Sequence, residues 1–339
     1  MLTFHPYQRL RILPGLILFS ILIYSCSIFS DPENDHKNGI SAGERLKGAI
    51  YFNVLNPHQI IRYVPALNTF EVIADQDKSP AAMSVSKNHR YLSFRKGENS
   101  IHFIDLESGL ERVYTSSYQL LDDLTMDGDG GLLVCPAIVG VDTTVLLVYS
   151  DSFQEEIFDA WQYRGVRDVL FSHTNFNLAW MSSRGLFLRN LTTPDIRHIT
   201  TDVLPPDDFS PSGRYLAAGG RIFSTQDGQL YPGKVSGRIK FIDDRFVLFN
   251  EEGSNVIKIA NLSGTTIIDL YESLFREALF SVSPEGSFAA ILDKDETELI
   301  LVLLDLETKD ILRSVRFSLT SQTLAGDFFW RYPPLLSRP

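Results

Sequence analysis

The chain has 339 residues, 44% of them hydrophobic, and a formal net charge of −11 at pH 7. A chain of this length can bury a full hydrophobic core. A protein this acidic is a poor candidate for binding nucleic acid or an anionic lipid surface, and such a surplus of carboxylates ordinarily serves solubility. Its two cysteines, Cys26 and Cys135, exclude a framework of disulfide bonds as the basis of the fold.

The N-terminus has the pattern of an export signal. The first 11 residues hold two arginines and no acid, and residues 12–25 are apolar. The next junction, Ile-Tyr-Ser-Cys at 23–26, resembles a bacterial lipoprotein signal. That resemblance implies a diacylglyceryl group on Cys26, and Ser27 after it implies the outer membrane. Export with simple cleavage and an uncleaved signal anchor are the alternatives.

Four segments are therefore predicted. They are a signal peptide at 1–25, a flexible tether at 26–47, a folded domain at 48–332 and a C-terminal tail at 333–339. The tether is expected to be flexible because it is polar and contains proline, asparagine and glycine. Without the signal peptide, 29 basic residues face 42 acidic ones, a net charge of −13. The domain is expected in the cell envelope, lipid-anchored on the periplasmic side or at the outer membrane; secretion or a signal anchor would place it differently.

The folded part repeats a phrase. It reads SVSKNHRYLSF at 84–94, FSPSGRYLAA at 209–218 and FSVSPEGSFAA at 280–290. A second phrase follows the first and third copies, as FIDLESG at 103–109 and LLDLETK at 303–309. Repeats about 40 residues apart, each made of short strands and turns, indicate a propeller or an array.

Each copy predicts the same order of strands and turns. Proline presets φ near −65° and glycine accepts positive φ, so Ser-Pro-x-Gly closes a tight hairpin between two apolar strands. The Asp-Leu-Glu turn leads from a third strand to a polar fourth strand, at 110–114 and 311–315. Four antiparallel strands make one blade, and blades packed face to face share a core.

This repeat resembles the bacterial WD40-like, TolB-type β-propeller repeat, with its Ser-Pro-Asp-Gly hairpin. The copies at 209–218 and 280–290 carry the resemblance, whereas 84–94 lacks the proline and the glycine of the turn. The Trp-Asp pair of eukaryotic WD40 blades is absent. The resemblance implies an all-β propeller and leaves the function open, because propellers serve many unrelated roles.

Degenerate copies fill the gaps and place inner strands near residues 84, 125, 170, 209, 240 and 280. The run 325–330 has the pattern of an inner strand with no blade after it, while 49–75 holds three strand-like runs without an inner strand. We expect the C-terminal strand to complete the first blade, which would leave no open sheet edge between the ends. Seven blades result; six is the alternative, because the unit at 206–232 is very short.

Few residues stand out as a site. Asp127 and Asp129, in the run Asp-Gly-Asp-Gly, could bind Ca²⁺ through carboxylate oxygens, although this run lies where the repeat needs a hairpin turn. His89 and His173 lie near inner-strand turns and could line one mouth of the channel or stay solvated. Cys135 follows an apolar run and is predicted to be a buried structural thiol.

The sequence shows no nucleophile elbow, Walker loop or dinucleotide-binding motif, and it indicates no cofactor. We predict a membrane-anchored, monomeric propeller that binds a protein or an envelope polymer and no nucleic acid. The alternatives are a propeller enzyme, a hydrolase or lyase with its site at the channel mouth, and a sensor of a small ligand or ion. Converging carboxylates and histidines would favour these alternatives, and a broad apolar-rimmed face would favour docking.

Overall fold

The computed structural model describes residues 46–55, 58–75, 80–158, 164–172, 174–193, 195–233, 235–274, 278–294, 298–318 and 323–331. The predicted signal peptide, Cys26, most of the tether, His173 and the C-terminal tail lie outside these ranges. Within them the chain forms strands and turns and no helix. It follows that these ranges contain no helix long and apolar enough to cross a membrane.

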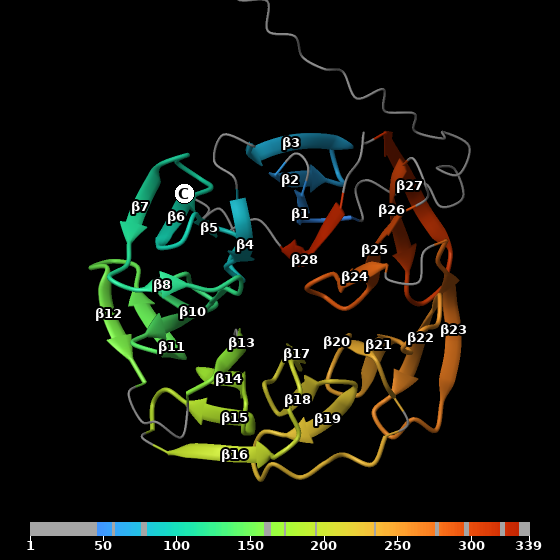
Figure 1. Ribbon diagram of the computed structural model, residues 1–339. Coiled ribbons are helices and arrows are strands. Elements are labelled where there is room, and N and C mark those ends of the chain that lie inside the picture. Colours follow the sequence, from blue (N-terminus) through green and yellow to red (C-terminus); the bar gives the residue numbers. More distant parts are fainter. Residues whose placement is uncertain are drawn as a thin grey trace, which may run out of the picture.

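Seven sheets stand around a central axis like the blades of a propeller, each beginning at the axis and ending at the rim (Figure 1). The strands of every blade follow one another from the axis outward.

Blade 1 has β28 (Thr323–Arg331), β1 (Ala49–Leu55), β2 (Gln59–Val64) and β3 (Thr69–Ala74). Blade 2 has β4 (Pro80–Val85), β5 (Tyr91–Lys96), β6 (Ser100–Asp105) and β7 (Glu111–Thr115). Blade 3 has β8 (Gln119–Leu120) and β9 (Thr125–Met126), then β10 (Leu132–Val139), β11 (Asp142–Tyr149) and β12 (Gln154–Ile157). Blade 4 has β13 (Val166–Phe171), β14 (Asn177–Ser182), β15 (Gly185–Asn190) and β16 (Ile196–Thr200). Blade 5 has β17 (Pro206–Phe209), β18 (Tyr215–Ala218) and β19 (Arg221–Ser224). Blade 6 has β20 (Arg238–Phe241), β21 (Phe246–Asn250), β22 (Val256–Asn261) and β23 (Ile267–Glu272). Blade 7 has β24 (Leu279–Val282), β25 (Phe288–Lys294), β26 (Glu298–Asp305) and β27 (Ile311–Ser318).

The two ends of the described chain close the ring. Strand β28 pairs antiparallel with β1, with Ile50 opposite Trp330 and Phe52 opposite Phe328. Figure 1 shows this red C-terminal strand lying on the axial side of the blue N-terminal blade. The predicted closure is confirmed, and so are the seven blades. Each described inner strand of the ring is therefore paired with its neighbour in the sheet.

The repeated serine and glycine hold the turn between the first and second strands. In blade 5 the Ser210 amide donates to the Tyr215 carbonyl at 3.0 Å, and the Ser210 hydroxyl accepts from the Tyr215 amide at 3.2 Å. Gly213, three residues after this serine, has a φ of 71°, which a residue without a Cβ adopts at no steric cost. The Ser-Pro-x-Gly phrase thus encodes the hairpin that turns each inner strand outward.

Two blades depart from the four-stranded pattern. Blade 5, the short unit at 206–232, has three strands, and a single bridge between Phe223 and Leu230 stands in place of its fourth. In blade 3 the inner strand is split, because β8 and β9 both pair with β10. Both units keep an inner strand, so the circular arrangement persists around them.

The core lies between blades. Among the described residues there are seven hydrophobic clusters, one for each pair of neighbouring blades. In the cluster between blades 7 and 1, Ile50 and Phe52 pack with Leu301 and Leu303, and all four are buried. A sheet buried on both faces needs two apolar faces, which explains why second and third strands read as near-continuous hydrophobic runs.

Candidate functional site

A cavity of about 420 Å³ lies at the centre of the ring. Residues of the inner strands β4, β9, β13, β17, β20, β24 and β28 and of their turns line it. Since these strands surround the propeller axis in Figure 1, we call this cavity the channel. Its volume falls in the range of roughly 300–1,000 Å³ that small-molecule sites occupy.

The channel is lined by charged side chains of both signs. The carboxylates come from blades 3, 4 and 5: Asp123, Asp168, Asp207 and Asp208. The cationic groups come from blades 1, 2 and 6: Arg331, Lys87, Arg238 and Lys240. Four acidic and four basic residues balance one another in this cavity, in a protein whose whole chain carries a charge of −11.

The positions of the hairpin turns distinguish the two ends of the channel. The amides of Ser86 and Ser172 close equivalent hairpins, by donating to the carbonyls of Tyr91 and Asn177. Lys87 follows its serine directly and lies at the turn-side mouth, the end where inner strands run into their hairpins. Asp168 precedes its serine by four residues and lies near the start-side mouth, the opposite end.

Two of the carboxylates connect neighbouring blades. Asp123 accepts a hydrogen bond from the Val169 amide at 2.5 Å, and Asp208 accepts one from the Phe241 amide at 2.9 Å. In each case the donor belongs to the inner strand of the next blade. Hydrogen bonds to backbone amides fix these carboxylates in place, so their charge is preorganised rather than mobile.

Asp207 is held differently. Its Oδ2 is buried and has no hydrogen-bond partner among the described residues, while the Lys240 ammonium donates to the Asp207 main-chain carbonyl at 2.7 Å. Burial raises the pKa of Asp207 to about 6, against the opposing effects of Lys240 and Arg238. A carboxylate with spare acceptor capacity and a pKa near neutrality is thereby presented to the cavity.

Burial also shifts the other charged groups of the channel. It raises the pKa values of Asp168 and Asp208 above their usual range. It lowers the pKa of Lys87, an effect that the nearby Arg331 charge adds to. The pKa of Arg331 falls to about 10 because burial outweighs the attraction of Asp208. Charges held in this way gain more from an oppositely charged ligand than charges in open water.

The predicted metal candidates lie in a hairpin turn outside this channel. Asp127 is buried at the end of β9 and accepts a hydrogen bond from the Leu132 amide at 3.2 Å, while Asp129 is exposed. Asp127 therefore has the same role in its turn as Ser210 in blade 5, since each side chain accepts a hydrogen bond from the backbone amide five residues later. Within the described ranges, no group of three or more His, Cys, Asp or Glu residues is arranged to hold a metal ion.

His89, proposed for a channel mouth, lies between blades 1 and 2. It is 7% exposed and forms a hydrogen bond with the Tyr51 hydroxyl. Burial, together with the charges of Arg62 and Arg331, lowers the pKa of His89 to about 4. It takes no part in lining the cavity. Cys135, predicted to be a buried thiol, is 2% exposed and unpaired, and burial raises its pKa.

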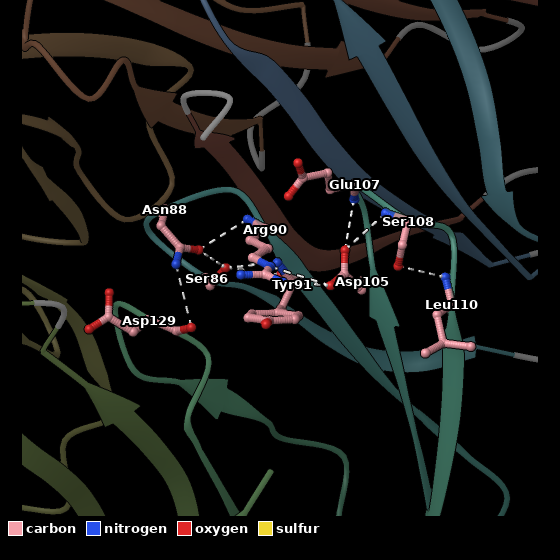
Figure 2. A network of polar contacts seen from close by, with 9 residues as sticks. All are labelled: Ser86, Asn88, Arg90, Tyr91, Asp105, Glu107, Ser108, Leu110 and Asp129. Carbon is pink, nitrogen blue, oxygen red and sulfur yellow. Dashed lines mark hydrogen bonds and ion pairs between the residues drawn. The ribbon is translucent and has the colours of Figure 1, made fainter. Parts of the chain in front are cut away.

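The turn side of blade 2 is held by a polar network, drawn in Figure 2. Asp105 accepts hydrogen bonds from the amides of Glu107 and Ser108, each at 3.0 Å, and from the Arg90 guanidinium at 3.3 Å. The Asn88 amide side chain reaches the Asp129 carbonyl of blade 3 at 3.4 Å. The turn beside Lys87 is therefore tied to both its own blade and the next.

The sequence did not bring the charged residues of the channel together as one site. They come from different repeats, so no local spacing unites them. One signal was available: Thr125, Asp208 and Lys240 each stand two residues before the residue that closes the hairpin. Aligning the repeats on that residue would have shown that these three side chains lie at the same level of the channel.

No known family model matches this chain, and no curated protein matches it. Solved structures do. TolB from Acinetobacter baumannii matches with a TM-score of 0.57 and 12% identity, over 84% of this chain and 67% of TolB. The dihydro-haem d1 dehydrogenase NirN, in complex with DHE, matches with a TM-score of 0.54 and 12% identity, over 83% of this chain and 75% of NirN. The β-propeller domain of Cps50 (Swd1) from Myceliophteria thermophila matches with a TM-score of 0.48 and 15% identity, over 71% and 97% of the two chains. At these identities the likeness concerns the fold alone, which is a seven-bladed β-propeller.

Proposed function

We propose that this protein is a binding module of the cell envelope, which recognises a protein or an envelope polymer through its charged channel. The observation that carries the proposal is the set of eight charged side chains around one cavity. Two of its carboxylates are fixed by backbone amides of the adjacent blade. A rigid, preorganised set of charges of both signs suits selective binding, because a mismatched ligand leaves charges unpaired and desolvated.

The envelope location rests on the N-terminal sequence. A charged start, an apolar run and Cys26 after a small residue support export and lipidation. Lipidation by several chains would give stable anchoring, and the polar tether would hold the propeller away from the membrane. Replacing Cys26 by alanine should abolish acyl-chain labelling and leave an unprocessed precursor. Unchanged processing of that variant would instead indicate ordinary cleavage.

Site-specific photo-crosslinking in the native host tests the binding role. A crosslinker placed at Pro211, on the turn-side mouth, should capture one defined envelope component. The same crosslinker at exposed Lys309 on the rim serves as the control. Charge-neutral variants of channel residues Asp208 and Lys240 should remove the mouth crosslinks. Capture from the rim alone, or capture that survives these variants, would contradict binding through the channel.

One observation supports a second candidate function, that of an enzyme. The pKa of Asp207 is raised to about 6 inside a cavity that also holds Lys240 and Arg238. A carboxyl that titrates near neutral pH can act as a general acid or base in hydrolysis or elimination. Turnover of an envelope polymer that disappears in Asp207→Asn and persists in Asp129→Asn would favour this candidate over simple binding.

A further inference from the structure

The interface between blades 6 and 7 carries exposed apolar side chains where it reaches the turn side of the molecule. Phe246, Ile268 and Ile311 are 36%, 37% and 45% exposed, and we call these three residues the seam patch. None of the three lines the channel. The seam patch is therefore a surface that the proposed function does not use.

The two residues from blade 6 face blade 7. Phe246 alternates with Leu248 along β21, and Ile268 of β23 is the cross-strand partner of Ile259. Leu248 and Ile259 both belong to the hydrophobic cluster between blades 6 and 7. Residues two apart on a strand, and residues directly opposite on neighbouring strands, point to the same face of a sheet. Phe246 and Ile268 thus continue this cluster to the surface.

The residue from blade 7 faces blade 6 in the same way. Ile311, at the start of β27, lies opposite Leu304, which is buried in the same cluster. Farther along the two blades, the Tyr271 hydroxyl of β23 donates to the Asp293 carboxylate at 3.3 Å. Strands β23 and β27 are neighbours on the rim in Figure 1. The three apolar side chains therefore gather over one seam.

The surroundings of the seam patch are apolar too. Ile242, Leu270 and Leu306 are partly buried against the same cluster. The next seam, between blades 7 and 1, differs, because the Arg313 guanidinium lies across it and donates to the Pro65 carbonyl at 2.6 Å. Exposed apolar side chains that gather at one place mark an interaction surface, whereas single ones are ordinary.

The turns that border the seam patch are acidic. They are residues 242–246 and 262–266 of blade 6 and residues 283–288 and 306–310 of blade 7. Their five acidic residues outnumber their two basic ones: Asp243, Asp244, Glu285, Glu307 and Asp310 against Arg245 and Lys309. A second copy of the chain would bring two such acidic borders together, which repulsion opposes. Charge complementarity favours a basic partner.

We propose that the seam patch docks a protein segment whose apolar side chains are flanked by lysine or arginine. The apolar side chains of the segment cover Phe246, Ile268 and Ile311, and its cationic groups meet the carboxylates of the bordering turns. Apolar contact at the centre of an interface and charge at its edge divide affinity and orientation in this way. The surface is independent of the channel, so either can function without the other.

Three matched synthetic peptides test this proposal on the purified full-length protein. The first has pairs of leucines flanked by lysines, the second has serine in place of leucine, and the third has glutamate in place of lysine. Fluorescence anisotropy at about 0.15 M salt limits attraction between distant charges. We expect the first peptide to bind with one site per chain, at least about tenfold more tightly than the other two.

Variants of the apolar residues locate the site. Replacing both Ile268 and Ile311 by serine should weaken the leucine–lysine peptide about tenfold, because apolar contact area is lost. The matched control replaces Val141 and Val203 by serine, since both valines are exposed at the start-side end of the molecule. All four positions are exposed, and thermal unfolding of each variant shows that it is folded.

Variants of the acidic border test the charge of the partner. Glu307→Gln combined with Asp310→Asn should weaken the same peptide by about threefold and reduce the salt dependence of its binding. Asp142→Asn combined with Glu252→Gln removes the same charge from exposed start-side turns and should change binding little.

Several results would overturn the proposal. They are no binding of the leucine–lysine peptide, equal binding of the three peptides, or equal losses in the seam and control variants. Dimerisation of the chain that the Ile268 and Ile311 variant abolishes would assign the patch to a second copy instead. None of these results bears on the channel. A partner crosslinked at Lys309, beside the patch, and distinct from the component captured at Pro211 would support two separate surfaces.

Discussion

Single residues in left-handed backbone conformations show how far the repeats have diverged. The Asp-Leu-Glu turn ends on Gly109 in blade 2, with a φ of 70°, and on Lys309 in blade 7, with a φ of 64°. The hairpin that has Gly213 in blade 5 has His89 in blade 2, with a φ of 60°. His89 gains a hydrogen bond to Tyr51 in exchange, whereas the exposed Lys309 gains no contact of that kind with the described residues.

Lys309→Gly should therefore stabilise the protein. A residue with a Cβ costs roughly 1–2 kcal/mol in this backbone conformation, and the greater freedom of glycine in the unfolded chain returns part of that. We expect the free energy of unfolding to rise by about 0.5–1 kcal/mol in urea titration. Lys309→Ala keeps the strained Cβ and should change stability little. A glycine variant no more stable than the alanine variant would refute the argument.

Asp207 gives stability a pH dependence of known sign. Burial raises its pKa from 3.8 to about 6, so between these values the folded protein holds a proton that the unfolded chain has lost. The stability contributed by this group is thus present below pH 3.8 and lost as the pH rises through about 6. Asp207→Asn should raise the melting temperature at pH 7.5, by an amount equivalent to roughly 1–3 kcal/mol, and have little effect near pH 4. An equal effect of the substitution at both pH values would show that ionisation is not its cause.

At the scale of elements, polar contacts join neighbouring blades in addition to the hydrophobic packing between them. The Asp123 and Asp208 contacts in the channel are two cases, and the rim has others. Glu155 of blade 3 accepts hydrogen bonds from Tyr114 and Ser116 of blade 2. The Arg313 guanidinium of blade 7 donates to the Pro65 carbonyl of blade 1 at 2.6 Å. These contacts fix each blade relative to the next, and this fixed geometry holds the charged side chains of the channel in their positions.

Asp293 is the most buried residue among these polar contacts between blades, and it gives the clearest test of what they contribute to stability. With 0% exposure in blade 7, it accepts from the Ser273 hydroxyl at 2.7 Å and the Leu274 amide at 2.8 Å, both just after blade 6. Asp293→Ala would leave buried donors without acceptors and should cost about 2–4 kcal/mol in denaturant unfolding. Asp269→Ala, at an exposed position of β23, should change stability by no more than about 0.5 kcal/mol. Similar losses of stability in the two variants would contradict the conclusion that Asp293 joins blades 6 and 7.

At the scale of the whole molecule, removing the closing strand should destabilise every blade. A chain that ends before residue 325 lacks most of β28, so β1 loses its inner partner and the clusters on both sides of blade 1 are opened. We expect one cooperative unfolding transition at a clearly lower temperature. Deleting only residues 333–339, which lie beyond β28, is the control. Equal melting temperatures for the shortened and full chains would mean that ring closure contributes little.

The sequence predicted the architecture much better than the site. Inner strands expected near residues 84, 125, 170, 209, 240 and 280 all exist, because hairpin chemistry and apolar runs are local signals. The closing role of 325–330 was also predictable, because this strand has no blade after it and the three strands of 49–75 lack an inner strand. Asp168, Asp207 and Lys87 escaped notice because their proximity follows from the circular arrangement of blades. Their raised or lowered pKa values arise from burial that no spacing along the chain reveals.

The pairing of Ala49 with Arg331 also sets the order in which the fold can be completed. These partners lie about 280 residues apart, so contacts across the seam form only after nearly the whole domain has been synthesised. Until then β1 presents a bare edge of unpaired backbone groups, a template for pairing with other chains. Contacts this distant in sequence also slow folding. We therefore expect a long-lived open ring that depends on chaperones to reach closure without aggregating.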